Sequence, residues 1–129
     1  MTDTPYVRPD MQALLAGLAA LNAPKITEQS LDEARAAYQR LHALADRPAR
    51  DLPVIRDLAC PGPHGDIRLR LYGAREERED AGPIIVFFHG GGFVIGDLET
   101  HHALCTEIAA LTDLPLVAVD YVRAPEHPF

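Results

Sequence analysis

Two short apolar runs separated by a helical segment constrain the fold of this chain more than any other feature. Residues 84–88 read Ile-Ile-Val-Phe-Phe, apolar at every position, as expected of a strand that helices cover on both faces of a sheet. Residues 116–119 form a second such run, and residues 98–111 between them carry leucine and isoleucine at helical spacing. A buried strand, a helix and another buried strand make a right-handed crossover. We therefore expect residues 84–119 to begin a parallel α/β sheet.

The first third of the chain predicts two helices with no strand between them. Residues 9–23 and 30–46 each place apolar side chains three and four positions apart, which forms one apolar stripe on a helix. The second helix begins at Ser30, whose hydroxyl forms a capping box with Glu33 three residues later. Because no strand lies between the helices, their stripes must pack against each other or against a later part of the chain.

The segment between these helices and the first apolar run has a different pattern. Residues 54–58 predict a short strand, and residues 67–72 alternate strictly between the two faces of a strand. A period of two with a charged outer face indicates an antiparallel or edge strand. The charged run at 73–83 predicts a solvated loop. We therefore divide this α/β chain into a helical unit, residues 1–48, and a sheet-forming unit, residues 49–129.

Charge and hydropathy exclude several classes of partner. Twelve Lys and Arg residues against nineteen Asp and Glu residues give a formal net charge of −7. No broad basic surface is available to neutralise phosphates, which argues against nucleic acid as a partner. The longest apolar run falls far short of the roughly 20 residues that cross a bilayer, and the N-terminus lacks the basic and apolar regions of a secretory signal. We expect a cytoplasmic protein with no membrane span.

The cysteines and histidines carry no metal or disulfide signature. Cys60 and Cys105 form at most one disulfide and lack the Cys-x-x-Cys spacing of a zinc site, so we expect reduced thiols with at least one of them buried. His101 and His102 stand at a helix start, where adjacent side chains point about 100° apart and do not easily face one ion. The sequence predicts no metal site.

Three consecutive glycines, residues 90–92, come directly after the first apolar run, at the end of a strand where open α/β sheets bind ligands. A flexible turn is one interpretation. A dinucleotide-binding loop needs glycines at positions i, i+2 and i+5, and this spacing is absent whether it is counted from Gly90 or from Gly91. The Gly-Lys-Ser/Thr sequence of a phosphate-binding loop does not occur either. The remaining interpretation is an oxyanion hole, in which backbone N–H groups stabilise a developing negative charge.

Two motifs give the chain a specific resemblance. Residues 89–97 read HGGGFVIGD and residues 120–126 read DYVRAPE, separated by one predicted helix and one predicted strand. The sequence resembles the hormone-sensitive-lipase-like branch of the α/β hydrolases, which includes the bacterial type IV esterases. The resemblance covers nearly all of this chain. It implies the N-terminal part of an α/β-hydrolase fold: two cap helices, then the first strands of a mostly parallel sheet with an antiparallel edge.

The resemblance also implies roles for the residues of the glycine loop. The N–H groups of Gly91 and Gly92 would point at the substrate oxyanion, and Phe93 would line the acyl or alcohol pocket. Support of the loop is implied for four residues: His89, Gly90, Asp120 and Tyr121. His89 is then not the catalytic base. A strand-ending aspartate and a half-buried tyrosine explain the last two of the four equally well.

The family also needs a serine in a Gly-x-Ser-x-Gly elbow, followed along the chain by Asp or Glu and by His. The only serine, Ser30, has no flanking glycine and is interpreted as a helix cap. Cys105 lies inside a predicted helix and lacks the strand-turn-helix setting of a nucleophile. We therefore expect the N-terminal segment of a longer serine esterase, inactive alone, that acts on carboxylic esters of short to medium acyl chains without a cofactor.

Two alternatives remain open from the sequence. Some proteins of this fold, such as plant gibberellin receptors, keep the glycine loop and bind a small molecule without catalysis. The chain is alternatively a complete product that acts as a partner of a full-length hydrolase, although its sheet would then expose apolar strand and helix faces. The resemblance also leaves open a homodimer of the full-length protein.

Overall fold

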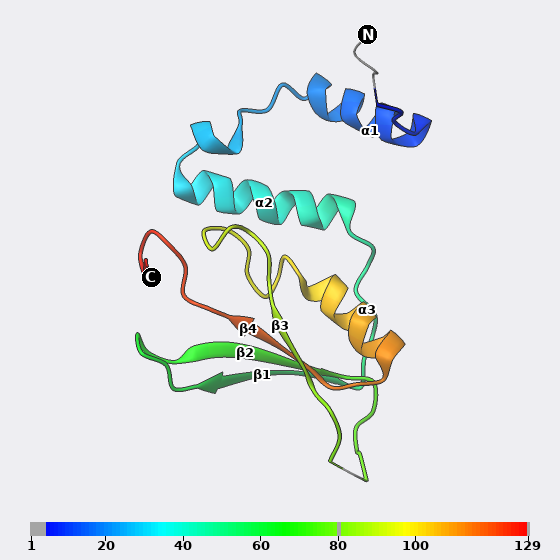
Figure 1. Cartoon of the computed structure of the whole chain (residues 1–129), viewed down its shortest axis with the longest axis vertical. Coiled ribbons are helices and arrows are strands. Elements are labelled where there is room, and N and C mark those ends of the chain that lie inside the picture. The colour runs from blue at the N-terminus through cyan, green and yellow to red at the C-terminus, as the bar shows by residue number, and fades with distance from the viewer. Residues whose placement is uncertain (1–4, 80, 129) are drawn as a thin grey trace.

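The computed structural model describes residues 5–79 and 81–128. Two helices of the N-terminal part lie on one side of a four-stranded sheet, and a third helix packs on the sheet itself (Figure 1). In chain order the elements are α1 (Pro9–Ala20), the 3-10 helix η1 (Ile26–Glu28), α2 (Leu31–Ala45), β1 (Val54–Cys60), β2 (Ile67–Gly73), β3 (Ile85–Phe88), α3 (His102–Thr112) and β4 (Leu116–Asp120). All the helices and strands that the sequence predicts are present, and η1 is additional.

The sheet brings the two apolar strands together at one edge. Its strand order is β1-β2-β4-β3, and β3 and β4 are parallel neighbours joined through α3, as predicted. β2 is antiparallel to both β1 and β4, so the described sheet is mixed, with an antiparallel edge beside the parallel pair. In the register of the parallel pair, Phe88 lies opposite Val119. His89 and Asp120 therefore lie at the ends of adjacent strands, at the same edge of the sheet.

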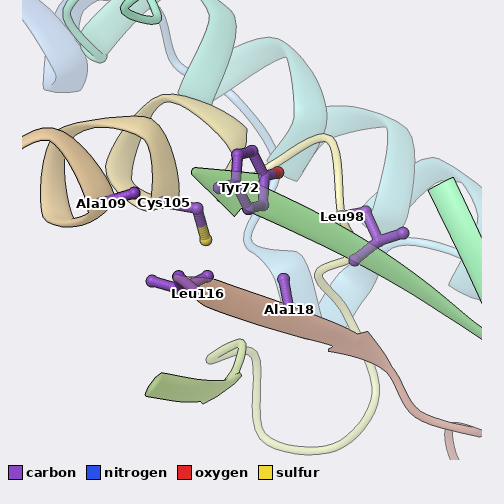
Figure 2. Packing of buried hydrophobic residues seen from close by; sticks show 6 residues of the cluster. All are labelled: Tyr72, Leu98, Cys105, Ala109, Leu116 and Ala118. Atoms are coloured by element: carbon purple, nitrogen blue, oxygen red, sulfur yellow. The ribbon is translucent and has the colours of Figure 1, made fainter. Parts of the chain in front are cut away.

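The core lies between α3 and one face of the sheet (Figure 2). Its buried apolar residues are Tyr72, Leu98, Cys105, Ala109, Leu116 and Ala118. On β3, Ile85 and Phe87 pack against this cluster, whereas Val86 and Phe88 on the opposite face are 53% and 63% exposed. The prediction that helices cover β3 on both faces is wrong for the described residues, because α3 covers only one face.

The two N-terminal helices differ in burial. α2 begins at its predicted cap, where the Glu33 carboxylate accepts a hydrogen bond of 2.9 Å from the Ser30 N–H and the Ser30 hydroxyl accepts one from the Glu33 N–H. Ala34 of α2 is buried. α1 buries none of its residues, so the predicted burial of its apolar stripe is not observed. Figure 1 shows α2 between α1 and the sheet, above the loops that leave the strands.

The remaining sequence predictions about the chain as a whole are tested only in part. Both cysteines are free and Cys105 is buried, as expected. None of the helices in residues 5–79 and 81–128 is long and apolar enough to cross a membrane. The division into units 1–48 and 49–129 stays a prediction.

Candidate functional site

The glycine loop turns sharply immediately after β3. Gly91 and Gly92 have φ angles of 128° and 61°, which lie in the left-handed region that favours glycine. A Cβ atom on Gly91 would lie 1.9 Å from the carbonyl oxygen of Ile95. The same turn is closed by the Gly91 carbonyl oxygen, which accepts hydrogen bonds from the N–H groups of Val94 at 3.1 Å and Ile95 at 3.0 Å. Glycine is therefore required at position 91 by both conformation and space.

The carbonyl groups of the loop are held by the rest of the chain. Besides Gly91, five loop residues have carbonyl groups that accept hydrogen bonds. The His89 carbonyl accepts from the Tyr121 hydroxyl at 2.7 Å, and the Gly90 carbonyl accepts from His89 Nδ1 at 2.9 Å. The other three are Phe93, which accepts from the Ala124 N–H at 2.9 Å, Val94, which accepts from Arg35 Nε at 3.0 Å, and Gly96, which accepts from Arg123. Within the described part of the chain, the N–H groups of Gly91 and Gly92 donate to no acceptor.

The direction of these two N–H groups is determined by the carbonyl contacts. In a trans peptide the C=O and N–H bonds point in opposite directions. The N–H of Gly91 belongs to the peptide whose oxygen is the Gly90 carbonyl, and the N–H of Gly92 to the peptide whose oxygen is the Gly91 carbonyl. Because both oxygens are bound within the protein, both N–H groups point away from those contacts. The loop thus presents two neighbouring donors.

His89 and Tyr121 form the floor of the loop. His89 is 5% exposed, and its ring stacks on that of Tyr121 with 4.2 Å between centroids and 14° between planes. The His89 Nδ1 atom faces a carbonyl oxygen, which only accepts hydrogen bonds, so we assign the ring proton to Nδ1. The Nε2 atom is buried and has no partner among the described residues. Burial raises the pKa of the Tyr121 hydroxyl, which keeps it a donor.

Two of the predicted site residues lie differently from the others. The Asp120 carboxylate has Oδ2 at 3.6 Å from Arg68 Nε, while its Oδ1 is buried without a partner in the described chain. Asp120 therefore contacts a neighbouring strand, and no hydrogen bond joins its side chain to the described glycine loop. The Phe93 side chain is 58% exposed. Its φ of 62° continues the left-handed turn of the loop.

A cavity of about 450 Å³ lies between the glycine loop and the start of α2. On the loop side it is lined by Gly91, Gly92, Val94 and Ile95. On the helix side it is lined by Ile26, Thr27, Gln29, Leu31 and Ala34. The two N–H donors that lack an acceptor in the described part of the chain therefore belong to residues that line a mainly apolar cavity. Phe93, which the resemblance assigns to the pocket, does not line this cavity.

Comparisons with known proteins connect this geometry to a family. A family profile for the alpha/beta hydrolase fold matches residues 85–129. The chain is 42% identical over 99 residues to esterase LipI of Mycobacterium tuberculosis, covering 76% of this chain and 31% of LipI. It is 33% identical over 131 residues to an ethyl acetate hydrolase of Pseudomonas putida, covering 95% of this chain and 41% of that protein.

Comparison with solved structures identifies the same kind of protein as the sequence comparison. An ester hydrolase from the metagenome of Lake Arreo superimposes with a TM-score of 0.88 and 28% identity, over 96% of this chain and 40% of that one. The chain has the α/β-hydrolase fold, and in sequence and structure it is similar to the hormone-sensitive-lipase-like esterases of that superfamily. The predicted fold class and the predicted resemblance to these esterases are confirmed. This α/β-hydrolase chain spans about two fifths or less of the length of these relatives.

Two arginines of this α/β-hydrolase chain contact the loop, and the sequence predicts this contact for neither, although Arg123 lies in the DYVRAPE motif. Arg35 on α2 binds the Val94 carbonyl, and Arg123 after β4 binds the Gly96 carbonyl. The partners of Arg35 are 59 to 91 residues away along the chain. Periodicity and capping patterns relate residues a few positions apart, so no such pattern in the sequence marks the contacts of Arg35.

The alternative nucleophile and metal ligands do not form a second centre. Ser30 is the exposed cap of α2, as predicted. Burial raises the pKa of the Cys105 thiol to about 12, which disfavours the nucleophilic thiolate. His101 is the cap residue of α3, and His102 places Nδ1 3.0 Å from the buried Tyr72 hydroxyl. No group of three or more potential metal ligands occurs among the described residues.

Proposed function

We propose that this chain supplies the oxyanion hole of a carboxylic ester hydrolase. One observation carries the proposal: the N–H groups of Gly91 and Gly92 have no acceptor among the described residues and lie at the edge of a mainly apolar cavity, on a loop whose carbonyls are held elsewhere. Attack on an ester carbonyl produces a tetrahedral intermediate with a negatively charged oxygen. Two preorganised N–H donors that need not reorient stabilise that oxygen more than they stabilise the neutral carbonyl of the substrate.

The proposed reaction takes the serine acyl-enzyme route and needs no metal or organic cofactor. The single serine of the chain, Ser30, donates its hydroxyl to the Glu33 carboxylate at 2.6 Å as part of a helix cap. His89 donates from Nδ1 to a neighbouring carbonyl and lies buried beneath the loop. We assign neither residue to the catalytic triad. In this proposal the nucleophilic serine, the acid and the base come from residues outside these 129.

The substrate we propose is an ester with a short to medium acyl chain. The cavity beside the two donors offers Ile26, Leu31 and Ala34 as an apolar wall. Burial of an acyl chain against such a wall contributes binding energy in proportion to the apolar area removed from water. The name of the related ethyl acetate hydrolase points to a small ester as well.

The test is hydrolysis of p-nitrophenyl acetate and butyrate by the polypeptide encoded by the complete reading frame that contains these residues. Gly92→Ala is the informative variant, because nothing lies within 4 Å of the added Cβ but the φ of 61° strains an L residue. Rotation of the peptide group that carries the Gly92 N–H would relieve this strain of roughly 1–2 kcal/mol. Gly17→Ala is the matched control, since its Cβ also meets nothing within 4 Å and lies in helix α1.

We expect Gly92→Ala to lower kcat by about 10- to 100-fold, a fraction of the effect of deleting one oxyanion donor. We expect Gly17→Ala to keep the kcat of the wild type. Turnover at the buffer rate by the wild type, combined with tight binding of a butyl phosphonate analogue, would instead identify a non-catalytic binding protein. Equal kcat values for Gly92→Ala and the wild type would refute the oxyanion assignment. The 129-residue chain alone should match the buffer blank.

A further inference from the structure

We infer that Arg35 is a positioning residue that fixes the oxyanion loop from helix α2. The inference rests on the proposed function of the loop and adds a residue on a different element. Its guanidinium group contacts the loop and the segment after β4 at the same time, and Arg35 is the residue of α2 that bonds to the backbone of the loop in the described structure.

The guanidinium group makes four hydrogen bonds. Nε donates to the Val94 carbonyl at 3.0 Å, and Nη2 donates to the Ala124 carbonyl at 3.3 Å. Nη1 and Nη2 donate to the two carboxylate oxygens of Glu126 at 2.7 and 2.9 Å. The Arg35 side chain is 20% exposed. A planar group with donors on several edges makes this set of contacts, which the compact ammonium of lysine does not reproduce.

These contacts close a ring of hydrogen bonds around the loop. Ala124, whose carbonyl binds Arg35, donates its own N–H to the Phe93 carbonyl at 2.9 Å. Val94, whose carbonyl also binds Arg35, donates its N–H to the Gly91 carbonyl. Arg35 therefore holds the loop directly through Val94 and indirectly through Ala124. The peptide that carries the Gly92 N–H includes the Gly91 carbonyl, so its orientation depends on this ring.

Glu126 keeps the guanidinium group in place. The bidentate contact with Arg35 lowers the pKa of the Glu126 carboxyl to about 2, so the pair stays charged at the pH of an esterase assay. The carboxylate itself is half-exposed, and its side-chain hydrogen bonds in the described chain are to Arg35 and not to the loop. Glu126 thus orients Arg35, and Arg35 orients the loop.

Arg35 also links the loop to the wall of the cavity. The preceding residue, Ala34, is buried and lines the cavity opposite Val94. A purely architectural role would let α2 shift and change only the fit of longer acyl chains, which affects KM. A positioning role changes the alignment of the N–H donors, which affects kcat for every acyl chain, including acetyl. The two roles therefore differ in which kinetic constant changes.

The experiment compares Arg35→Met, Arg35→Lys and Glu126→Gln with the control Arg40→Met, in the polypeptide of the complete reading frame. Arg40 is an exposed residue of the same helix. For p-nitrophenyl acetate we expect Arg35→Met to lower kcat by about 10- to 100-fold, as misplacement of a group by 1 Å does. Arg35→Lys should lower kcat by nearly the same factor, and Glu126→Gln should lower it by a smaller factor. Arg40→Met should leave kcat unchanged. If Arg35→Met does not fold, Arg35→Lys decides.

Two results would overturn the inference: an acetate kcat unchanged in both Arg35 variants, or a loss confined to KM for longer esters. Hydrogen exchange separates this failure from failure of the proposed function. If the wild type hydrolyses no ester, the oxyanion proposal fails, and exchange of the Val94 and Ile95 amides then decides the role of Arg35. Faster exchange of these two amides in Arg35→Lys than in Arg40→Met supports the positioning role. Equal exchange in the two variants refutes it.

Discussion

Removal of the Tyr121 hydroxyl tests whether the loop depends on the contacts beneath it. Tyr121→Phe keeps the ring that stacks on His89 at 4.2 Å and deletes the donor that binds the His89 carbonyl at 2.7 Å. A typical hydrogen bond contributes about 0.5–1.5 kcal/mol to stability, and a buried carbonyl left without a donor costs about 1–3 kcal/mol. Because His89 is 5% exposed, the range for a buried carbonyl without a donor applies. We expect a loss of about 2 kcal/mol.

The loss converts into a measurable shift of the melting temperature. For 129 residues the entropy of unfolding is about 0.27 kcal/mol/K, so a loss of 2 kcal/mol lowers Tm by about 7 °C. Thermal unfolding followed by circular dichroism gives this value. Tyr6→Phe is the matched control, since Tyr6 is 84% exposed and should leave Tm unchanged. A Tm for Tyr121→Phe within 1 °C of the control value would show that the hydroxyl does not hold the loop.

Three further changes test the core, the helix cap and the half-buried histidines at the start of α3. Leu116→Ala empties a fully buried core position and should lower the free energy of unfolding, measured by urea denaturation, by about 2–5 kcal/mol. A decrease below about 1 kcal/mol would contradict the assigned core. Ser30→Ala removes the acceptor for the Glu33 N–H and should cost about 1 kcal/mol, which Ser30→Asn should largely restore. Burial lowers the pKa values of His101 and His102, so stability should be complete above about pH 6.5 and fall as pH drops through their folded-state values. The urea midpoint measured from pH 8 to 5 checks this, and replacing both histidines with glutamine should flatten the profile.

Features set by neighbouring residues could be predicted from the sequence. The capping box needs only Ser30 and a residue three positions later, and the parallel pair β3 and β4 needs only two apolar runs with a helix between them. The glycine loop was located because it comes directly after β3 and because turns of positive φ favour glycine. In each case the physical cause lies in neighbouring residues or in elements that follow one another along the chain.

Features set by distant contacts could not be predicted in this way. Periodicity shows that α1 has an apolar stripe, but not whether any part of this chain covers it, and in the structure α1 buries nothing. The apolar pattern of β3 likewise does not distinguish a strand covered on both faces from one covered by α3 alone. The role of Arg35 depends on partners up to 91 residues away, so its pattern on α2 resembles that of any charged residue.

The candidate site combines the two kinds of information. The glycines determine that N–H groups without overlying side chains lie at the end of β3, and this can be read from consecutive residues. The direction of those groups is determined by what binds the opposite ends of the same peptides, and these ends are bound by His89 and by the turn that Arg35 holds. A glycine triplet in a turn without such anchors would sample many peptide orientations and lose the preorganisation on which stabilisation of an oxyanion depends. The motif therefore indicates where the donors lie, and the surrounding contacts decide whether they are aligned to act.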